Sequence, residues 1–590
     1  MRRLTSARAA RFSRVVLTAA TLIPIACKDT TTPAALPTKL VFTVQPVTTT
    51  AVAVIPTFQV AVQDAAGNTV ENATNSVSLG IATNQGIGAF LTGSTTVSAV
   101  NGVATFSNVG ISKAASGYAL LATATNLFSG VSTSFDVNAG PASKLVFTAQ
   151  PGAAVSGSTL PTINVTVLDA VDNLVTTGPS SITVAIGTNP GSGTLSGTTT
   201  VTPVNGVATF SDLSINNAGT GYTLTATATN LTGATSGIFT IRNPLVFSVV
   251  SAGYFHTCGV TTGGATYCWG DNTTFQLGIG SPSVSAVPVQ VAGGFTLASV
   301  VAGRDHTCGV NASGVAYCWG SNGQGRLGRA TTGGTSTTPA PVSGNITFAT
   351  TSAAYAHTCG VSTTGEGYCW GDNTAGALGN GSVTAATVPG AIAGGLSYAS
   401  ISPGRYFTCG RTTAGAGYCW GDNTDGELGD GTQTRRLSPV AVSGGYNFAS
   451  VSAGGFHACG LTTAGAAYCW GLNAFGQLGD GTLVSSTLPK AVSGSLAFAS
   501  ISAGNRHTCA VTAAGVAYCW GDNSGGALGT GTTNTSLVPI AVSGGLSFGS
   551  ISAGRFHTCG VTTAGTGYCW GGSYLGDGST SGSLVPVPIR

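Results

Sequence analysis

The sequence predicts an all-β protein in which two β-sandwiches precede a seven-bladed β-propeller. Three observations lead to this fold class. Charged residues make up only 7% of the 590-residue chain, while Gly, Ser, Thr, Ala and Val are abundant, which favours short strands and turns over helices. A segment of about 100 residues occurs twice. A segment of about 50 residues then occurs seven times, and a chain of this length needs several cores.

Residues 1–26 are typical of an export signal. An arginine-rich start without acidic residues is followed by the apolar run VVLTAATLIPIA, which ends at Ala26. This run is too short for a membrane-spanning helix, which needs about 20 residues. The small residue before Cys27 resembles a bacterial lipobox, whose cysteine is acylated and becomes the mature N-terminus. Residues 27–38 would then be a lipidated polar linker. The alternative is an ordinary signal peptide, with Cys27 discarded or unpaired.

The formal charge of +3 comes from this leader. Five of the 21 basic residues lie in the first 14 residues, which leaves 16 basic residues against 18 acidic ones in the rest of the chain. The remaining net charge is −2, so the sequence offers no basic footprint for nucleic acid.

Two similar segments follow, at residues 39–140 and 141–243. KLVFTVQP is repeated as KLVFTAQP, and NGVATFSNVGI as NGVATFSDLSI. Roughly seven alternating apolar and polar runs in about 100 residues fit an immunoglobulin-like sandwich. The pattern resembles bacterial Ig-like domains of surface and adhesin-type proteins. The Asp-rich segments 64–68 and 169–173 are interpreted as tight turns, with calcium binding as the alternative.

Residues 244–590 contain the shorter repeat. Each copy has two cysteines ten residues apart, and a tryptophan directly follows the second. The first cysteines recur every 50 or 51 residues, and all seven tryptophans of the chain occupy the same place. A fixed period of this length, made of short strands, indicates a closed toroidal repeat. The terminal SLVPVPIR and the early LVFSVV are candidates for the strand that closes the ring.

The motifs of this region resemble the regulator-of-chromosome-condensation repeat family. That family combines an S-A-G-x-x-H-T opening with a Y-x-W-G-x-N-x-x-G-x-L-G continuation, and seven such repeats form one propeller. The same propeller occurs in secreted bacterial proteins that inhibit β-lactamases by binding them on one face. This chain departs from the pattern at Phe407, which replaces the histidine, at SAAYAH in copy three, and at WGGSYLG in copy seven.

The paired cysteines predict disulfides within each copy. In TCGVTTGGATYCW the two cysteines lie at equal distances from a turn near Gly263, so they face each other across a hairpin at a separation a disulfide can span. The export signal supplies an oxidising compartment. The predicted pairs are Cys258–Cys268, Cys308–Cys318, Cys359–Cys369, Cys409–Cys419, Cys459–Cys469, Cys509–Cys519 and Cys559–Cys569.

A metal site is the rival interpretation, because His256, Cys258 and Cys268 could act as zinc ligands. Phe407 breaks this trio in copy four although the cysteines remain there. We therefore expect the six histidines to be structural and the protein to need no metal or cofactor. No nucleophile motif, phosphate loop or recurring acid–base pair is present. The acidic DNTDGELGDG of copy four does not have the spacing of a calcium loop.

The two residues between SAG and HTC vary most among the copies and are rich in Arg, Tyr and Phe. Equivalent positions of a propeller lie on one ring, so these side chains either pack between blades and line the channel or form a binding rim. A second variable region follows the WG turn, as in TTFQ and NAFG. The candidate rim consists of Tyr254, Phe255, Arg304, Asp305, Tyr355, Arg405, Tyr406, Phe456, Asn505, Arg506, Arg555 and Phe556.

These features together predict an exported lipoprotein on the cell envelope. Its propeller would be a non-enzymatic binding or adhesion module for a protein or glycan, presented on Ig-like spacers and tethered to the membrane by the lipid. The alternative function is an extracellular enzyme that uses the central cleft of the propeller.

Overall fold

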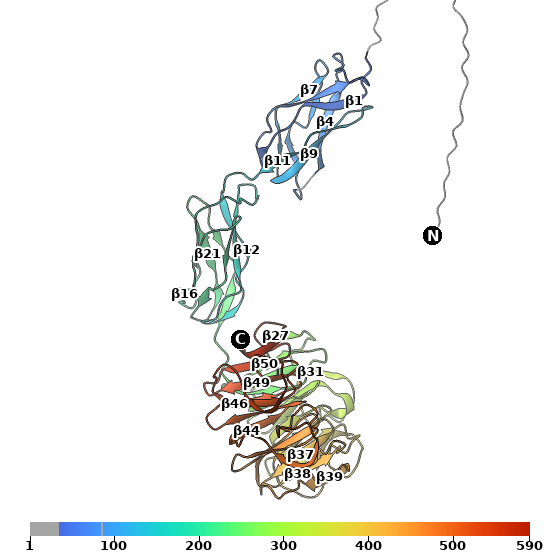
Figure 1. The fold of residues 1–590 in the computed structure, drawn as a ribbon, viewed down its shortest axis with the longest axis vertical. Helices are drawn as coiled ribbons and strands as arrows, with labels where there is room; N and C mark the ends of the chain where they lie inside the picture. The colour runs from blue at the N-terminus through green and yellow to red at the C-terminus, as the bar shows by residue number, and fades with distance from the viewer. Residues whose placement is uncertain (1–34, 84–85) are drawn as a thin grey trace, which may run out of the picture. The chain divides into compact units, whose positions relative to one another are not determined.

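The computed structural model describes residues 35–83 and 86–590, so the export signal, Cys27 and the first part of the linker lie outside the described residues. Within these ranges the chain forms strands and one short 3₁₀ turn, η1 (Gly323–Gly325), which confirms the all-β class. None of the described residues forms a helix long and apolar enough to cross a bilayer. The described residues divide into two compact units, those of 35–153 with 159–240 and those of 154–158 with 241–590 (Figure 1).

The two long sequence repeats form similar sets of short strands (Figure 1). The first repeat contains β1 (Lys39–Val44), β2 (Thr49–Thr50), β3 (Phe58–Gln63), β4 (Ser76–Thr83), β5 (Leu91–Gly93), β6 (Thr96–Ser98), β7 (Val103–Phe106), β8 (Val109–Ile111), β9 (Ala115–Thr123), β10 (Gly130–Val131) and β11 (Phe135–Asn138). The second contains β12 (Lys144–Ala149), β13 (Ala154–Val155), β14 (Ile163–Leu168), β15 (Ile182–Ile186), β16 (Leu195–Ser196), β17 (Thr200–Val201), β18 (Val207–Phe210), β19 (Ser214–Ile215), β20 (Gly219–Tyr222), β21 (Leu224–Thr227), β22 (Ala234–Thr235) and β23 (Phe239–Arg242).

The apolar core of the first repeat joins two sheets. One sheet has the order β1-β3-β7, which the second repeat reproduces as β12-β14-β18. The other contains β2, β11, β9, β4 and β6. Phe58 of β3 and Leu120 of β9 are both completely buried in the shared core. The alternation of apolar and polar residues seen in the sequence therefore places one face of each sheet inward.

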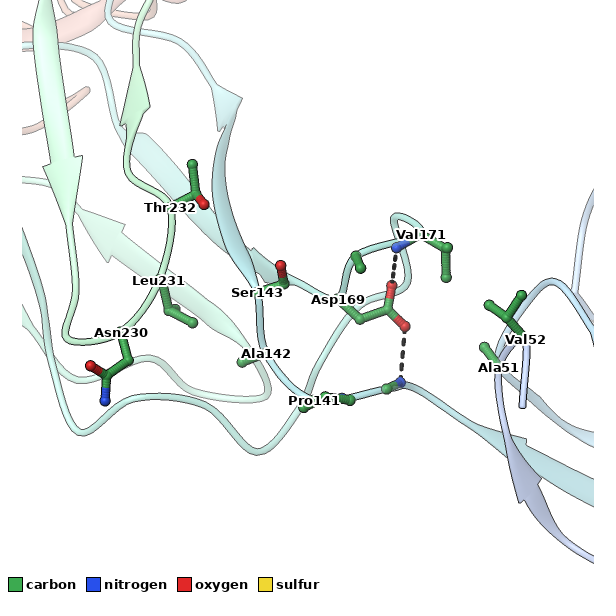
Figure 2. A pocket seen from close by; sticks show the side chains of 12 residues that line it. Ala51, Val52, Pro141, Ala142, Ser143, Asp169, Val171, Asn230, Leu231 and Thr232 are labelled. Atoms are coloured by element: carbon green, nitrogen blue, oxygen red, sulfur yellow. Dashed lines mark hydrogen bonds between the residues drawn. The ribbon is translucent and has the colours of Figure 1, made fainter. Parts of the chain in front are cut away.

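The Asp-rich turns are held by hydrogen bonds from N–H groups. In the second repeat, the Asp169 carboxylate accepts bonds from the backbone N–H groups of Val171 (2.9 Å), Asn173 (2.8 Å) and Gly140 (2.9 Å) and from the Asn173 side chain (2.9 Å). Figure 2 shows two of these bonds. Because N–H donors occupy both carboxylate oxygens, the geometry is that of a tight turn rather than of a calcium ligand.

The C-terminal unit contains seven four-stranded antiparallel sheets, each made of four consecutive strands (Figure 1). The innermost strands are β24 (Phe247–Ala252), β28 (Ser299–Ala302), β32 (Phe348–Ala353), β36 (Tyr398–Pro403), β40 (Phe448–Ala453), β44 (Phe498–Ala503) and β48 (Phe548–Ala553). The second strands are β25 (His256–Thr261), β29 (His306–Val310), β33 (His357–Ser362), β37 (Phe407–Thr412), β41 (His457–Thr462), β45 (His507–Thr512) and β49 (His557–Thr562).

The two remaining strands of each sheet complete the blade. The third strands are β26 (Thr266–Gly270), β30 (Ala316–Ser321), β34 (Gly367–Gly371), β38 (Gly417–Gly421), β42 (Ala467–Gly471), β46 (Ala517–Gly521) and β50 (Gly567–Gly571). The outer strands are β27 (Ser285–Gln290), β31 (Thr335–Pro341), β35 (Ala386–Ala391), β39 (Arg436–Ala441), β43 (Ser486–Ala491), β47 (Ser536–Ala541) and β51 (Ser583–Pro588). This arrangement confirms the predicted seven-bladed propeller.

A proline interrupts the middle of every outer strand. Proline has no N–H group to offer to another strand, so it protects these free edges from pairing with a second chain. The prolines are Pro288, Pro339, Pro389, Pro439, Pro489, Pro539 and Pro586.

Each tryptophan packs into the core of the preceding blade. Trp319 is completely buried beside Cys258, Cys268 and Leu277, and its indole N–H donates to the carbonyl of Gln276 (2.9 Å). Gly278 lies against this ring with φ of 68°, and a Cβ there would meet the indole nitrogen at 2.6 Å. The Gly–Leu–Gly segment of each repeat is therefore the surface on which the next blade's tryptophan packs.

The ring closes by direct packing of the last blade on the first. The early LVFSVV segment supplies β24 and the terminal SLVPVP segment supplies β51, so each remains in its own blade and neither serves as a shared clasp strand. Phe247 donates its N–H to the carbonyl of Gly565 (2.8 Å), and Trp269 packs beside Cys559 and Cys569. The closing contact thus repeats the contact between neighbouring blades.

Candidate binding face of the propeller

The second and third strands of every blade are joined by a disulfide. The cysteines stand directly opposite each other in the antiparallel register, as in Cys258 and Cys268, whose Cα atoms are 4.1 Å apart. All fourteen cysteines are completely buried. The structure confirms the seven predicted pairs, and no group of three or more potential His, Cys, Asp or Glu metal ligands occurs in residues 35–83 and 86–590. The zinc alternative is thereby contradicted.

The histidines link neighbouring blades. His256 Nε2 lies 2.7 Å from the Thr307 hydroxyl of the next blade, and that hydroxyl donates to the Gln276 carbonyl (2.7 Å). Because the hydroxyl proton is used in this way, the imidazole must donate from Nε2. Burial lowers the pKa of His256 to about 3, so the ring is neutral at pH 7. Six such pairs occur around the ring: His256–Thr307, His306–Thr358, His357–Thr408, His457–Thr508, His507–Thr558 and His557–Thr257.

The seventh interface replaces this pair with an apolar one. Phe407 stands where the other blades have histidine, and Ala458 stands where the next blade would have threonine. Both are buried in one apolar cluster. The two departures from the repeat are therefore a single matched exchange of a hydrogen-bonded pair for an apolar contact.

We expect the effects of substitutions at Phe407 and Ala458 on the free energy of unfolding to be strongly coupled. Phe407→His alone would bury an imidazole N–H without its acceptor, and Ala458→Thr alone would overpack the ring, each lowering the free energy of unfolding by about 1–3 kcal/mol. The double variant should recover much of this loss, as a double-mutant cycle from urea unfolding would measure. Simple additivity of the two single variants would contradict the pairing.

The two variable residues of each blade follow the innermost strand and lie at one end of the ring. In five blades the first residue lines a cavity of about 180 Å³ at the mouth of the central channel; these residues are Tyr254, Tyr355, Arg405, Gly455 and Asn505. The Tyr254 hydroxyl donates to Asn505 Oδ1 (3.2 Å), which joins the first blade to the sixth. The second residue is more outward in two blades, where Phe255 and Phe556 are 37% and 41% exposed.

Arginine and tyrosine side chains interleave at this mouth. The rings of Tyr254 and Tyr355 are 5.4 Å apart, and the Arg304 guanidinium lies 4.3 Å from the centre of the Tyr355 ring. Arg405 lies 4.9 Å from the same ring, and Arg555 lies 5.6 Å from the Tyr254 ring. We call Tyr254, Arg304, Tyr355, Arg405, Asn505 and Arg555 the mouth cluster.

The predicted rim residues are thus brought together on one face, and they are half-buried rather than fully exposed. The remaining rim residues surround the mouth cluster. Arg506 stacks 4.5 Å from the ring of Phe475, which belongs to the second variable region. Asp305 contacts Arg304 (3.3 Å) and Arg326 (3.6 Å). Part of each of these side chains packs against its neighbours and part of it is exposed. The packing interpretation and the binding-rim interpretation therefore apply to different atoms of the same residues.

Burial shifts the pKa values of several ionisable groups on this side of the ring, among them Tyr254, Asp305 and Glu427. Desolvation raises the pKa of the Tyr254 hydroxyl to about 12, against the lowering effect of Arg405 and Arg555. It also raises the pKa of Glu427 to about 7. Glu427 is 2% exposed and accepts a bond from the N–H of Asp425 (2.9 Å).

Sequence reasoning missed the position occupied by Glu427. In each copy it is the residue before the leucine of the Gly–Leu–Gly segment, and it is Gln276 in blade 1 and Arg326 in blade 2. Arg326 reaches under the next blade and donates to the carbonyl of Tyr355 (3.3 Å). Its variation among the copies was the available signal, because a position that is Gln, Arg, Ala, Glu or Tyr in different blades must have different neighbours in them.

The comparison with known families agrees with this geometry. A profile described as the Regulator of chromosome condensation (RCC1) repeat matches residues 263–310, 414–461, 464–511 and 514–561. A second profile of the same description matches residues 247–276, 298–326, 448–477 and 498–527. The propeller is built from RCC1 repeats. The matches all lie in the propeller.

Several solved structures share the fold of this propeller. Human WBSCR16 aligns with 20% identity and a TM-score of 0.51, over 55% of this chain and 89% of that one. Yeast RCC1 (Prp20), solved bound to Kap60, aligns with 20% identity and a TM-score of 0.51, over 59% and 85%. Prp20p from Saccharomyces cerevisiae gives 22% identity and a TM-score of 0.50, over 59% and 87%. At these identities the likeness extends to the fold.

Proposed function

We propose that this protein is an exported, lipid-anchored surface protein whose RCC1-repeat propeller binds a partner without catalysis. The observation that carries the proposal is the mouth cluster with its surrounding aromatic rim, because Arg, Tyr and exposed Phe are the residue types that dominate binding hot spots. The seven disulfides support an oxidising compartment. The two N-terminal repeats serve in this proposal as Ig-like spacers between the anchor and the propeller.

Binding through this face is tested by replacing Arg405 and Tyr406 with alanine. We expect the double variant to lose about 2 kcal/mol or more of the binding free energy for a partner captured from the cell surface. The matched control is Arg435→Ala, an exposed arginine outside the mouth cluster. Affinity should be measured by surface plasmon resonance and thermal stability by calorimetry. Equal binding by both variants, or a large loss of thermal stability in the double variant, would contradict a binding role.

Lipid attachment is tested separately at Cys27. We expect wild-type protein to fractionate with membranes and its mature N-terminal peptide to carry acyl chains, because an acylated cysteine anchors a protein through buried methylene groups. Cys27→Ala should prevent acylation and shift the protein away from its membrane location. Mass spectrometry of the N-terminal peptide shows whether Cys27 is the mature N-terminus and carries acyl chains. An unacylated N-terminus beyond residue 27 would contradict the lipid anchor.

A further inference from the structure

We propose that the mouth cluster binds a carboxylate carried at the tip of an acidic loop of a protein partner. This inference rests on the proposed binding function and names the chemistry of the partner. It is carried by the arginines of three separate blades, Arg304, Arg405 and Arg555, which converge on two tyrosine rings at the channel mouth.

Two of these guanidinium groups lack a counter-charge. Across residues 35–83 and 86–590, neither Arg405 nor Arg555 forms an ion pair with a carboxylate, whereas Arg304 contacts Asp305. The Nε atom of Arg405 is buried and has no hydrogen-bond partner among the described residues. A guanidinium without a carboxylate partner keeps its full charge, and a bound carboxylate would supply the missing counter-charge.

The aromatic rings hold the guanidinium groups without using their N–H donors. Arg405 lies 4.9 Å from the Tyr355 and Phe456 ring centres and 5.1 Å from that of Tyr406. Arg555 is similarly placed, 4.9 Å from the Phe255 ring and 4.4 Å from the Phe556 ring. Contact with a ring face fixes the position of a guanidinium but leaves its forked edge available for bidentate binding of a carboxylate.

The arginines also repel one another. Arg304 and Arg405 both lie within 5 Å of the Tyr355 ring centre, so they are within about 10 Å of each other, the Debye length at 0.1 M salt. Asp305 offsets part of this repulsion at Arg304, and the remainder destabilises the unliganded protein. The arrangement therefore indicates a site that gains stability when an anion binds.

The charges around the mouth cluster favour the tip of a protein loop over a long polyanion as its ligand. In four of the seven blades an aspartate donates its N–H to the backbone carbonyl of the second variable residue of its own blade, which places acids near the mouth; these are Asp271, Asp372, Asp422 and Asp522. A polyanionic chain lying across the face would meet these carboxylates. A single projecting loop reaches the arginines at the centre and can rest apolar side chains on the exposed Phe255 and Phe556.

The test is isothermal titration of the full chain with a capped peptide of three consecutive glutamates, beside its glutamine counterpart, polygalacturonate and sodium sulfate at constant ionic strength. We expect saturable binding of the glutamate peptide alone. Arg405→Gln and Arg555→Gln should each weaken it about tenfold or more, because each removes a charged hydrogen-bond donor. Arg435→Gln, which removes the same charge elsewhere on the chain, should leave binding unchanged. Arg405→Gln should also raise the melting temperature of the unliganded chain.

Three results would overturn the inference: no binding of the glutamate peptide, equal binding by Arg405→Gln and wild type, or binding of polygalacturonate or sulfate in its place. The binding function itself is judged by the surface-partner assay with the Arg405 and Tyr406 alanine variant. If the alanine variant loses its surface partner but the glutamate peptide does not bind to the wild type, the proposed binding function stands and the acidic-loop inference is rejected.

Discussion

Removing one disulfide from a blade is expected to lower the free energy of unfolding by roughly 2.5 to 3 kcal/mol, because each bond closes a loop of about ten residues. The variant Cys459→Ala with Cys469→Ala tests a single blade, and its bond is completely buried. A second variant with valine at both positions keeps more of the apolar volume, so it separates loss of the covalent link from the cost of a cavity. Urea unfolding followed by tryptophan fluorescence measures both.

Loss of all seven disulfides is expected to unfold the propeller. Their summed contribution, on the order of 20 kcal/mol, exceeds the typical 5–15 kcal/mol stability of a folded domain. Because every bond is buried, reduction should require denaturant or heat, and the reduced chain should not regain its circular dichroism spectrum on dilution. Peptide mapping without reductant should recover Cys258 linked to Cys268 and the equivalent pair of each other blade. A reduced chain that refolds to the oxidised stability would refute this account.

Acid is expected to unfold the propeller cooperatively between pH 6.5 and about 4. Burial lowers the pKa of His256, His357 and His457 to about 3 and that of His507 and His557 to about 4. It holds the pKa of His306 well below its ordinary value of 6.5. Since the unfolded chain protonates near 6.5, it binds more protons than the folded chain below that pH, so stability is intact above 6.5 and falls as the pH drops.

The size of this effect follows from the number of histidines. Each contributes about 1.4 kcal/mol per pH unit within the window, so six give about 8 kcal/mol per unit. Glu427 acts in the opposite sense, because its raised pKa makes the folded chain bind a proton between about 7 and 4.5, but it is one group against six. Urea midpoints measured from pH 7.5 to 4.5 should therefore fall steeply below 6.5.

The matched control copies the natural exception. His457→Phe with Thr508→Ala reproduces the Phe407–Ala458 interface in another blade and should reduce the net proton uptake on unfolding by one. Potentiometric titration of the unfolding reaction measures this number. A pH dependence that is unchanged in the double variant would show that the histidines do not control acid stability.

The period of the sequence determined the number of blades, and the ten-residue cysteine spacing determined the disulfides. Both are local properties. Cys258 and Cys268 belong to one hairpin, whose register is fixed by the turn between them, so no distant part of the chain is needed to pair them.

Other features depend on closure of the ring. His557 bonds to Thr257, 300 residues away, and Tyr254 bonds to Asn505, 251 residues away. The first follows only when the last blade packs on the first. The second follows only when blades one and six, with blade seven between them, both reach the channel axis. The Phe407–Ala458 exchange was visible in the sequence as two departures in adjacent copies, but their contact required the blade interface.

The mouth cluster shows the same division. Comparison of the copies predicted that its residues share a ring, since equivalent positions of a propeller repeat around one axis. Which of them turn inward, which guanidinium groups stack on which rings and which lack a carboxylate were decided by the tertiary structure, because these contacts join side chains of different blades. Each repeat therefore specifies its own blade and the surface on which the next blade packs. The side chains of the mouth cluster are specified only by the positions at which the seven copies differ.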